Sequence, residues 1–330
     1  MRLLYYKPVL NPAGIFPDYD TEQQDVSTAF VALMDGERTA DDIIGTLLRQ
    51  GYPIGEIIEV FNDLHQRNII FEAPEHDPGL LTEAEAHMFE QQLNTFTRLG
   101  FEKGGIFLPW SRSAVKQQHR LKEAKVMVVG DGLAACALIE SLVAVGIGTI
   151  YFCPLSPLGR DEEQKIAQRF KMNMYDFSEI HIHRAFTGVV DETYVRNSDA
   201  DLVIYMPSEF SEEQAAAING ICHTNGKDFV PYRVSFPHVF IGPFHLSDRS
   251  ACFCCYCSAQ DADGPNLDMP GGFNLPMGVD MLCVEIIKYY SRTADISARD
   301  GIWVFDMLTG KSRLEAVFRQ PGCALCGESH

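Results

Sequence analysis

The chain has 330 residues, which is enough for two domains that each bury a core. Its hydrophobic fraction of 46% and charged fraction of 22% are ordinary for a globular protein. The formal net charge of −18 argues against nucleic acid and against an anionic membrane surface as partners. No apolar run reaches the roughly 18–20 residues of a membrane helix, and the segment after Met1 does not read as a signal peptide. We therefore expect a cytoplasmic protein.

Residues 1–77 form a first region in which short extended stretches surround three helical patterns. Apolar residues recur at spacings of three and four within each helical pattern. Thr39 precedes the second pattern as a helix cap, Gly51 follows it as a stop, and a turn at Asp35-Gly36 ends the first. The predicted elements are a strand over Leu3–Val9, helices over Ser27–Leu33, Ile43–Leu48 and Ile54–His65, and a strand over Asn68–Phe71. This order predicts a winged-helix type of module.

The charge of the first region decides between two uses of such a module. Five basic residues stand against fourteen Asp and Glu residues, so the region carries a net charge of −9 and would repel phosphates. An exposed strand edge beside an amphipathic helix suits peptide binding by strand addition, with a purely structural subdomain as the alternative. The predicted peptide contacts are Glu22 and Val26 in a receiving edge over Thr21–Val26, and Ile57, Phe61 and Leu64 along the groove.

Residues 78–120 are predicted to be a helical connector, and residues 121–330 an α/β domain. Thr82 and Glu85 form a capping box at the start of the connector helix. Continuous apolar runs of the kind found in buried parallel strands appear further along the chain. The predicted α/β elements are strands over Val126–Val129, Thr149–Phe152 and Leu202–Tyr205, and helices over Leu133–Val145 and Met281–Tyr290. The first strand, helix and second strand make a βαβ unit, which predicts a Rossmann-type fold.

Ten cysteines require an explanation other than disulfides, because a reducing compartment keeps thiols free. Zinc takes four thiolates in a tetrahedron, and one Cys-x-x-Cys turn supplies two of them. Histidine, a usual ligand of catalytic zinc, is scarce near these turns, which favours a closed structural site. Buried or redox-active thiols are the alternative. The candidate ligands are Cys323 with Cys326, and either Cys252 with Cys255 or Cys254 with Cys257.

The glycine loop Gly130-Asp131-Gly132 follows a buried strand and opens a helix, which is the context of a nucleotide-binding loop. Two features argue against a bound nucleotide. The next strand ends in Cys153 rather than in an acidic residue that would hold the ribose, and Asp131 places negative charge where phosphates would lie. We therefore interpret Gly130 and Gly132 as a degenerate nucleotide loop and expect this chain not to bind ATP.

Several segments of the chain resemble the ThiF/ubiquitin-activating superfamily of adenylating enzymes. The resembling segments are Leu121–Gly132, Gly146–Ile150, Gly242-Pro243, Arg249–Cys255, Gly301–Asp306 and Pro321–Gly327. The resemblance favours Cys252 and Cys255 as the first zinc pair. It also exposes two further departures from active members, because Leu158–Arg160 is at best a vestige of an arginine motif and Tyr205–Ser208 lacks the expected metal-binding Asp. These departures imply a nucleotide site that has lost its function.

The N-terminal segment Leu33–Ile44 is similar to PqqD-like peptide-recognition domains, which bind the leader of ribosomally made precursor peptides. The two parts in this order resemble the leader-binding component of azole-forming maturases, the thiazole/oxazole-modified microcin systems. The resemblance implies a non-catalytic scaffold with a structural zinc that presents the core peptide to a YcaO-type, ATP-dependent cyclodehydratase making thiazolines or oxazolines. It further implies a flavin-dependent azoline dehydrogenase as a partner, and a homodimer. The alternative is an active adenylating enzyme that uses ATP to activate a peptide carboxylate.

Overall fold

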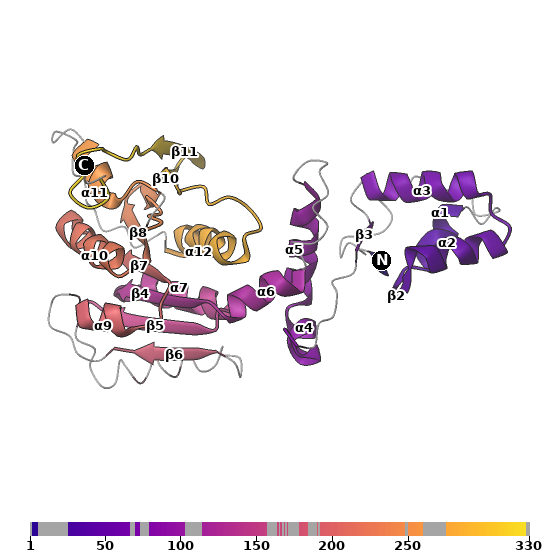
Figure 1. Ribbon diagram of the computed structural model, residues 1–330, viewed down its shortest axis with the longest axis horizontal. Helices are drawn as coiled ribbons and strands as arrows, with labels where there is room; N and C mark the ends of the chain where they lie inside the picture. Colours follow the sequence, from indigo (N-terminus) through magenta and orange to yellow (C-terminus); the bar gives the residue numbers. More distant parts are fainter. Residues whose placement is uncertain are drawn as a thin grey trace. The chain divides into compact units, whose positions relative to one another are not determined.

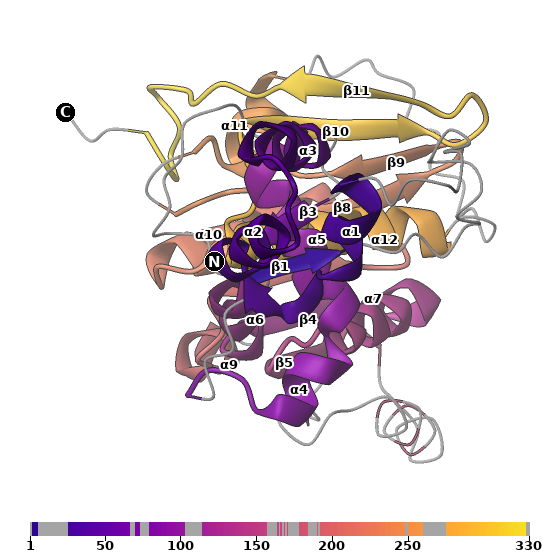
Figure 2. The ribbon, with the colours of Figure 1, turned by 90° about the vertical axis from the view of Figure 1, so that its right-hand side faces the viewer.

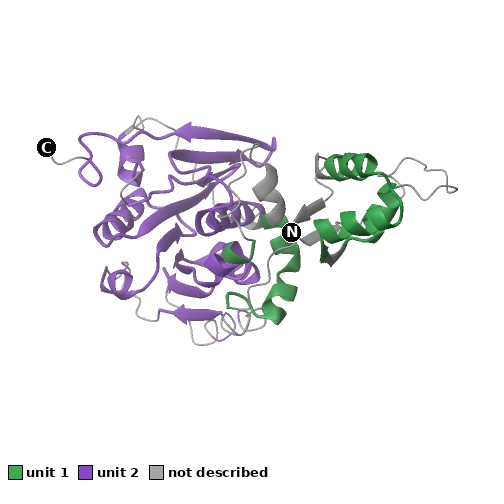
Figure 3. Ribbon diagram, turned by 45° about the vertical axis from the view of Figure 1, so that its right-hand side comes forward, with its two compact units in different colours: residues 1–116 green, residues 117–330 purple. Residues whose placement is uncertain are grey.

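The computed structural model describes residues 2–5, 26–66, 70–72, 79–102, 114–156, 178–183, 192–247, 250–259 and 275–327, and single residues at 164, 166, 168, 170 and 190. The chain divides into two compact units, residues 1–116 and residues 117–330, coloured separately in Figure 3. Within these described ranges, no helix is both long enough and apolar enough to cross a bilayer.

Residues 2–72 of the first unit, where described, form a small antiparallel sheet and three helices that pack on one another. The sheet has the strand order β2-β1-β3. The apolar faces of the helices enclose a core in which Phe30, Ile43, Leu47 and Ile57 are fully buried. The elements are β1 (Arg2–Tyr5), α1 (Val26–Ala32), β2 (Asp35–Thr39), α2 (Ala40–Arg49), α3 (Ile54–Gln66) and β3 (Ile70–Glu72).

The predicted cap of the second helix is confirmed in atomic detail. The backbone N–H of Asp42 donates to Oγ1 of Thr39 at 3.1 Å, and the backbone N–H of Thr39 donates to the Asp42 carboxylate at 3.1 Å. Gly51 ends this helix region at φ +94°, a conformation that favours glycine. The predicted turn at Asp35-Gly36 is wrong, because Asp35 begins β2 and pairs with Leu4 of β1.

The segment that the sequence predicts as a connector lies mostly in the unit of residues 1–116, and the capping box predicted for its first helix is confirmed. Thr82 and Glu85 exchange hydrogen bonds of 2.8 and 3.2 Å. The single helix expected here is two helices, α4 (Glu83–Met88) and α5 (Glu90–Glu102), with Phe89 at the break.

The second unit is built on one eight-stranded mixed sheet, shown in Figure 1. The strand order is β11-β10-β9-β8-β7-β4-β5-β6, and the five strands from β8 to β6 are parallel to one another. The strands are β4 (Lys125–Gly130), β5 (Thr149–Pro154), β6 (Glu179–Ile182), β7 (Leu202–Met206), β8 (Asp228–Ser235), β9 (His238–Ile241), β10 (Gly301–Asp306) and β11 (Lys311–Ala316). Figure 2 shows β9, β10 and β11 side by side as the antiparallel extension of this sheet.

Helices cover both faces of the sheet, as the Rossmann-type expectation requires. α7 and α12 pack together on one face, while α9, α10 and α11 follow one another on the other face (Figure 1). The strand β7 is buried along its whole length, which explains its continuous apolar sequence. The helices are α6 (Ala114–Lys122), α7 (Gly132–Ala144), α9 (Glu192–Asn197), α10 (Glu212–Thr224), α11 (Phe253–Ala259) and α12 (Leu275–Ser291).

Candidate metal centre

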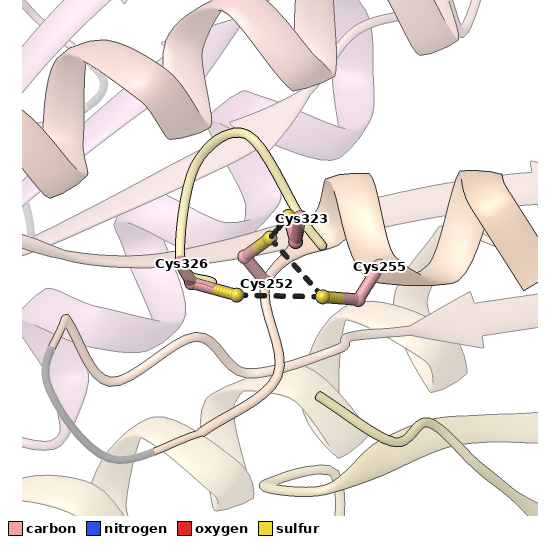
Figure 4. Close-up of side chains that lie close together, drawn as sticks. All are labelled: Cys252, Cys255, Cys323 and Cys326. Carbon is pink, nitrogen blue, oxygen red and sulfur yellow. Dashed lines mark hydrogen bonds between the residues drawn. The ribbon is translucent and has the colours of Figure 1, made fainter. Parts of the chain in front are cut away.

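Four cysteine sulfur atoms from two distant parts of the sequence meet beside α11. All four Sγ atoms lie within 4.8 Å of one another. The individual separations are 3.7 Å from Cys252 to Cys255, 3.5 Å from Cys252 to Cys323, and 3.3 Å from Cys255 to Cys326. Figure 4 shows their side chains turned toward a common centre. The structure therefore brings together the set Cys252, Cys255, Cys323 and Cys326, which we call the four-cysteine cluster.

The separations match the geometry of a tetrahedral zinc site. A Zn–S bond of about 2.3 Å in a regular tetrahedron gives S···S edges of about 3.8 Å. Three of the six separations, 3.3 to 3.7 Å, lie slightly inside this value, and all six are within 4.8 Å, so a small adjustment of the side chains would accommodate the ion. The four residues could thus hold one zinc ion with no position left for a substrate or water.

The structure also distinguishes the two possible first pairs. Cys252 and Cys255 are fully buried in the cluster, whereas Cys254 and Cys257 are half-buried and outside it. Residues three positions apart lie close together on one face of a helix, whereas residues one or two positions apart point in different directions. The two registers of the Cys-x-x-Cys pattern therefore face opposite sides, and only one of them meets the C-terminal pair.

The first pair is positioned by the start of α11. Cys252 immediately precedes the helix, and the backbone N–H of Cys255 donates to its carbonyl at 3.1 Å. The backbone N–H of Phe253 donates to Oδ1 of Asn219 on α10 at 2.9 Å. Because Asn219 is fully buried, this hydrogen bond fixes the first turn of α11 against α10. No pattern in the sequence indicated this role for Asn219.

The second pair is positioned by a tight turn that requires glycine. The backbone N–H of Gly327 donates to the carbonyl of Cys323 at 2.9 Å. A Cβ atom at Gly327 would lie only 2.4 Å from that carbonyl oxygen, so any other residue would push the turn apart. Nε of Arg319 donates to the Cys326 carbonyl at 2.5 Å, and the backbone N–H of Gln320 donates to Sγ of Cys255 at 3.4 Å.

The titration of the cluster fits a site that needs a cation. Burial raises the pKa of Cys255, and it also raises the pKa of Cys326. Burial acts in the same direction on Cys323, but hydrogen bonds from the backbone of Cys326 and Leu325 lower the pKa of that thiol to about 7. Four thiolates this close would repel one another, whereas a divalent ion would stabilise all four and release their protons.

The glycine loop lies at the carboxyl ends of the parallel strands, where nucleotides bind in this fold class. Gly130 ends β4, and a Cβ atom there would lie 2.4 Å from the carbonyl oxygen of Met206 on β7. Gly132 opens α7 at φ +70°. The loop therefore requires Gly130 for close backbone packing and favours Gly132 for its positive φ, with or without a bound phosphate.

Asp131 links three neighbouring strand ends through its carboxylate. Oδ1 accepts a hydrogen bond of 2.6 Å from the backbone N–H of Ser208, which follows β7. Oδ2 accepts a hydrogen bond of 3.0 Å from Oγ of Ser156, which follows β5. The carboxylate thus occupies the crevice between these strand ends, where a phosphate would otherwise accept the same hydrogen bonds.

The predicted peptide contacts in the first unit fare differently. Val26 begins α1 and is buried, so the prediction of an edge strand at this position is wrong, because its apolar side chain joins the helical core. Ile57 and Leu64 are also buried in that core, whereas Phe61 is half-buried, so Phe61 is the more accessible of the three predicted groove residues. Glu22 and the rest of the predicted edge, residues 21–25, lie outside the described residues.

No known protein family matches the sequence, and no curated protein sequence matches it. Solved structures do match the fold. The microcin C7 biosynthetic enzyme MccB in complex with N-formylated MccA is 14% identical, with a TM-score of 0.68 over 92% of this chain and 90% of that chain. Escherichia coli MccB with ATP gives 13% identity and a TM-score of 0.66 over 92% and 89% of the two chains.

A third structure, that of selenomethionine PaaA, is 13% identical, with a TM-score of 0.65 over 91% of this chain and 92% of that chain. Identities this low show the fold alone. The eight-stranded mixed sheet and the matches to MccB and PaaA establish that this chain has a ThiF-like, Rossmann-type α/β fold.

Proposed function

We propose that this chain is a non-catalytic scaffold that binds the leader of a ribosomally made precursor peptide and presents its core to a YcaO-type cyclodehydratase. The partner would use ATP to form thiazoline or oxazoline rings, and a flavin-dependent dehydrogenase could then oxidise them. The observation that carries the non-catalytic part of this proposal is the Asp131 carboxylate in the crevice of the parallel strands. The observation that favours a peptide as ligand is the fold shared with MccB, which has been crystallised with the peptide MccA.

The position of Asp131 disfavours nucleotide binding by two physical effects. Its negative charge would repel phosphates in the crevice, and its two hydrogen bonds already satisfy the donors of Ser208 and Ser156. A nucleotide would have to break both bonds without gaining an opposite charge from this loop. The same position holds the three strand ends together, so the carboxylate gives the sheet a rigid crevice without a bound ligand.

The leader groove that we propose uses the more exposed apolar residues of α3 and retains Phe61 from the three α3 residues that the sequence predicted. Ile54 and Ile58 are 48% and 46% exposed and lie four positions apart, and the half-buried Phe61 follows three positions after Ile58. We call Ile54, Ile58 and Phe61 the α3 stripe. An extended leader that adds to an edge of the small sheet would gain main-chain hydrogen bonds, while its apolar side chains pack on this stripe.

The zinc has a structural role in this proposal. The four-cysteine cluster joins the start of α11 to the turn at Cys323 and Cys326. Cys252 and Cys323 are 71 residues apart in sequence, and so are Cys255 and Cys326. Metal binding would therefore hold the turn at Cys323 and Cys326 against α11 and would couple zinc affinity to folding.

Tethering explains how such a scaffold accelerates a reaction that it does not catalyse. A core peptide held through its leader by a short flexible linker reaches an effective concentration of roughly millimolar at the partner's site. The partner can then process core sequences that it binds poorly by themselves.

Reconstitution tests this proposal. The chain, the YcaO-type partner, ATP and the precursor should together give loss of one water per ring by mass spectrometry, and a leaderless core should react far more slowly. Equal reaction of the leaderless core would refute the scaffold role.

The second candidate is ATP-dependent adenylation of a peptide carboxylate, and it is favoured by the ATP complex of MccB. Precursor-dependent exchange of pyrophosphate into ATP by this chain alone would establish it. We expect no exchange above that of a heat-inactivated sample.

A further inference from the structure

A guanidinium group in the second unit is largely buried and has no hydrogen-bond acceptor among the residues that the structure describes. It belongs to Arg233 of β8, in a small hollow on the sheet face that carries α10 and α11. Aromatic and aliphatic side chains form the walls of the hollow. They include Phe210, Phe240, Phe253, Tyr256 and Ile302.

Aromatic rings, rather than acceptors, hold the guanidinium in place. Cζ of Arg233 lies 4.3 Å from the ring centre of Phe240 and 5.5 Å from that of Phe210. The only acid paired with it in the described part of the chain is Glu212, at an Nη1–Oε1 distance of 3.7 Å. This distance exceeds a hydrogen bond. The Arg233 side chain is 18% exposed and that of Glu212 is 56% exposed, so the acid has more access to solvent than the cation.

A largely buried cation whose N–H groups lack acceptors is unfavourable unless an anion accepts their hydrogen bonds. The planar fork of arginine matches a carboxylate, to which it can donate two parallel hydrogen bonds. A phosphate dianion fits this hollow less well, because its walls are apolar and the Glu212 carboxylate lies beside the guanidinium. The chemistry of the site therefore selects a single negative charge on a planar group with an apolar neighbour.

We propose that a peptide carboxylate binds at the open side of this hollow, with Arg233 as its anchor, the rims formed by Phe210 and Phe240 as the surface for the adjoining apolar group, and Glu212 as the group that the ligand displaces. The hollow lies on β8, β9 and β10 and is separate from the crevice that Asp131 occupies at the ends of β4, β5 and β7. It does not depend on the leader-binding proposal, because all its residues belong to the unit of residues 117–330. Either the C-terminal carboxylate of a peptide or the side chain of an Asp or Glu residue could supply this planar, singly charged group.

Small probes can test the site in the full chain. N-acetyl-leucine carries a C-terminal carboxylate, N-acetyl-aspartate α-amide carries a side-chain carboxylate, and N-acetyl-leucinamide and inorganic phosphate are the controls. Binding is followed by NMR at the Nε–Hε resonance of Arg233. We expect at least one of the two acids to bind saturably, at least tenfold tighter than the amide and phosphate, and the difference between the acids identifies the source. Equal binding of acid and amide, or tighter binding of phosphate, would overturn the proposal.

Variants separate the anchor from its neighbour. Arg233→Met should weaken acid binding at least tenfold, measured by calorimetry, while Arg196→Met on α9 should leave it unchanged. Glu212→Gln removes the displaced carboxylate and should tighten binding about three- to fivefold, the range of an exposed ion pair. The matched control Glu213→Gln should have no effect. If Arg233→Met does not fold, the Glu212→Gln result decides, and unchanged or weaker binding in that variant would contradict the proposed site.

Discussion

Replacing a single cysteine should distinguish the four-cysteine cluster from its neighbours on α11. Cys255→Ser removes a buried sulfur that lies 3.3 Å from Cys326 and accepts a hydrogen bond from the backbone of Gln320. Cys257→Ser is the matched control, because Cys257 lies on the same helix, is half-buried and belongs to the alternative Cys-x-x-Cys pair. We expect the first variant to lose zinc and the second to keep one ion per chain.

The magnitude follows from mass action. An ion present at about 1,000 times its Kd stabilises the folded state by about 4 kcal/mol, which is lost when a variant no longer binds it. Residues 117–330 make a unit of about the size for which each kcal/mol changes Tm by about 2–4 °C. The Cys255→Ser variant should therefore melt about 8–16 °C below the parent chain, while Cys257→Ser should stay within about 2 °C of it.

Zinc content and melting temperature are measured on the same samples. Elemental analysis after gel filtration gives the ion-to-chain ratio, and circular dichroism gives the melting curve. Retention of one zinc ion by Cys255→Ser, or loss of zinc by Cys257→Ser, would refute the assignment of the ligands. Absence of zinc from the parent chain purified without added metal, and its failure to bind added zinc, would refute the site itself.

Three further predictions concern the α3 stripe, the crevice and a buried histidine. Ile58→Glu should weaken leader binding about tenfold, because about 1.5 kcal/mol of apolar contact is lost, while the control Glu59→Gln should not. Equal affinities of the two variants in fluorescence polarisation would show that Ile58 does not contact the leader. Asp131→Ala should lower the free energy of unfolding in urea by about 1–3 kcal/mol, because Ser208 and Ser156 lose their charged acceptor. An unchanged unfolding midpoint would show that the carboxylate does not stabilise the fold. Burial, together with the nearby His223, lowers the pKa of His245 to about 4 in the folded state. Between this pKa and that of the unfolded state, His245 is protonated in the unfolded chain and neutral in the folded one. Stability is therefore lost as the pH falls below the unfolded pKa of about 6.5, by roughly 1.3 kcal/mol between pH 7.5 and 5.5, and a His245→Gln variant with the same pH dependence would contradict this origin.

Three of the five parallel strands, β4, β5 and β7, could be predicted because they are central and largely buried, whereas β6 has no buried residue and β8 was not predicted. The sequence Val126–Val129 and the fully buried β7 both read as continuous apolar runs, and the predicted strands coincide with β4 and β7. The antiparallel extension carries no such signal. β11 is exposed along nearly its whole length and alternates charged with apolar residues only weakly, so its pairing with β10 is decided by tertiary contacts.

Errors in the first unit have a common physical cause. The Asp35-Gly36 pair has turn composition, yet it joins a strand because β1 offers a partner from more than thirty residues away. The sequence predicts Val26 in a receiving edge and Ile57 and Leu64 along a groove, but all three side chains are buried in the core because the apolar face of a helix packs there. The apolar residues that stay exposed on α3 are Ile54 and Ile58, of which Ile58 is next to the buried Ile57.

The cysteine pairs illustrate what spacing can and cannot settle. The segment at α11 contains two equally spaced pairs, and only the fold shows which pair meets Cys323 and Cys326. The groups that support the cluster were not predictable either. The amide of Asn219 and the turn at Gly327 act through backbone hydrogen bonds, which leave no spacing pattern in a sequence.

Fluorescence polarisation of a labelled leader peptide against the whole chain is a direct test of the proposed scaffold role. We expect saturable binding with a Kd in the micromolar range or tighter, competition by unlabelled leader but not by the core segment, and no change on adding ATP and magnesium. Absence of saturable binding, or binding that requires ATP, would contradict a non-catalytic leader-binding scaffold.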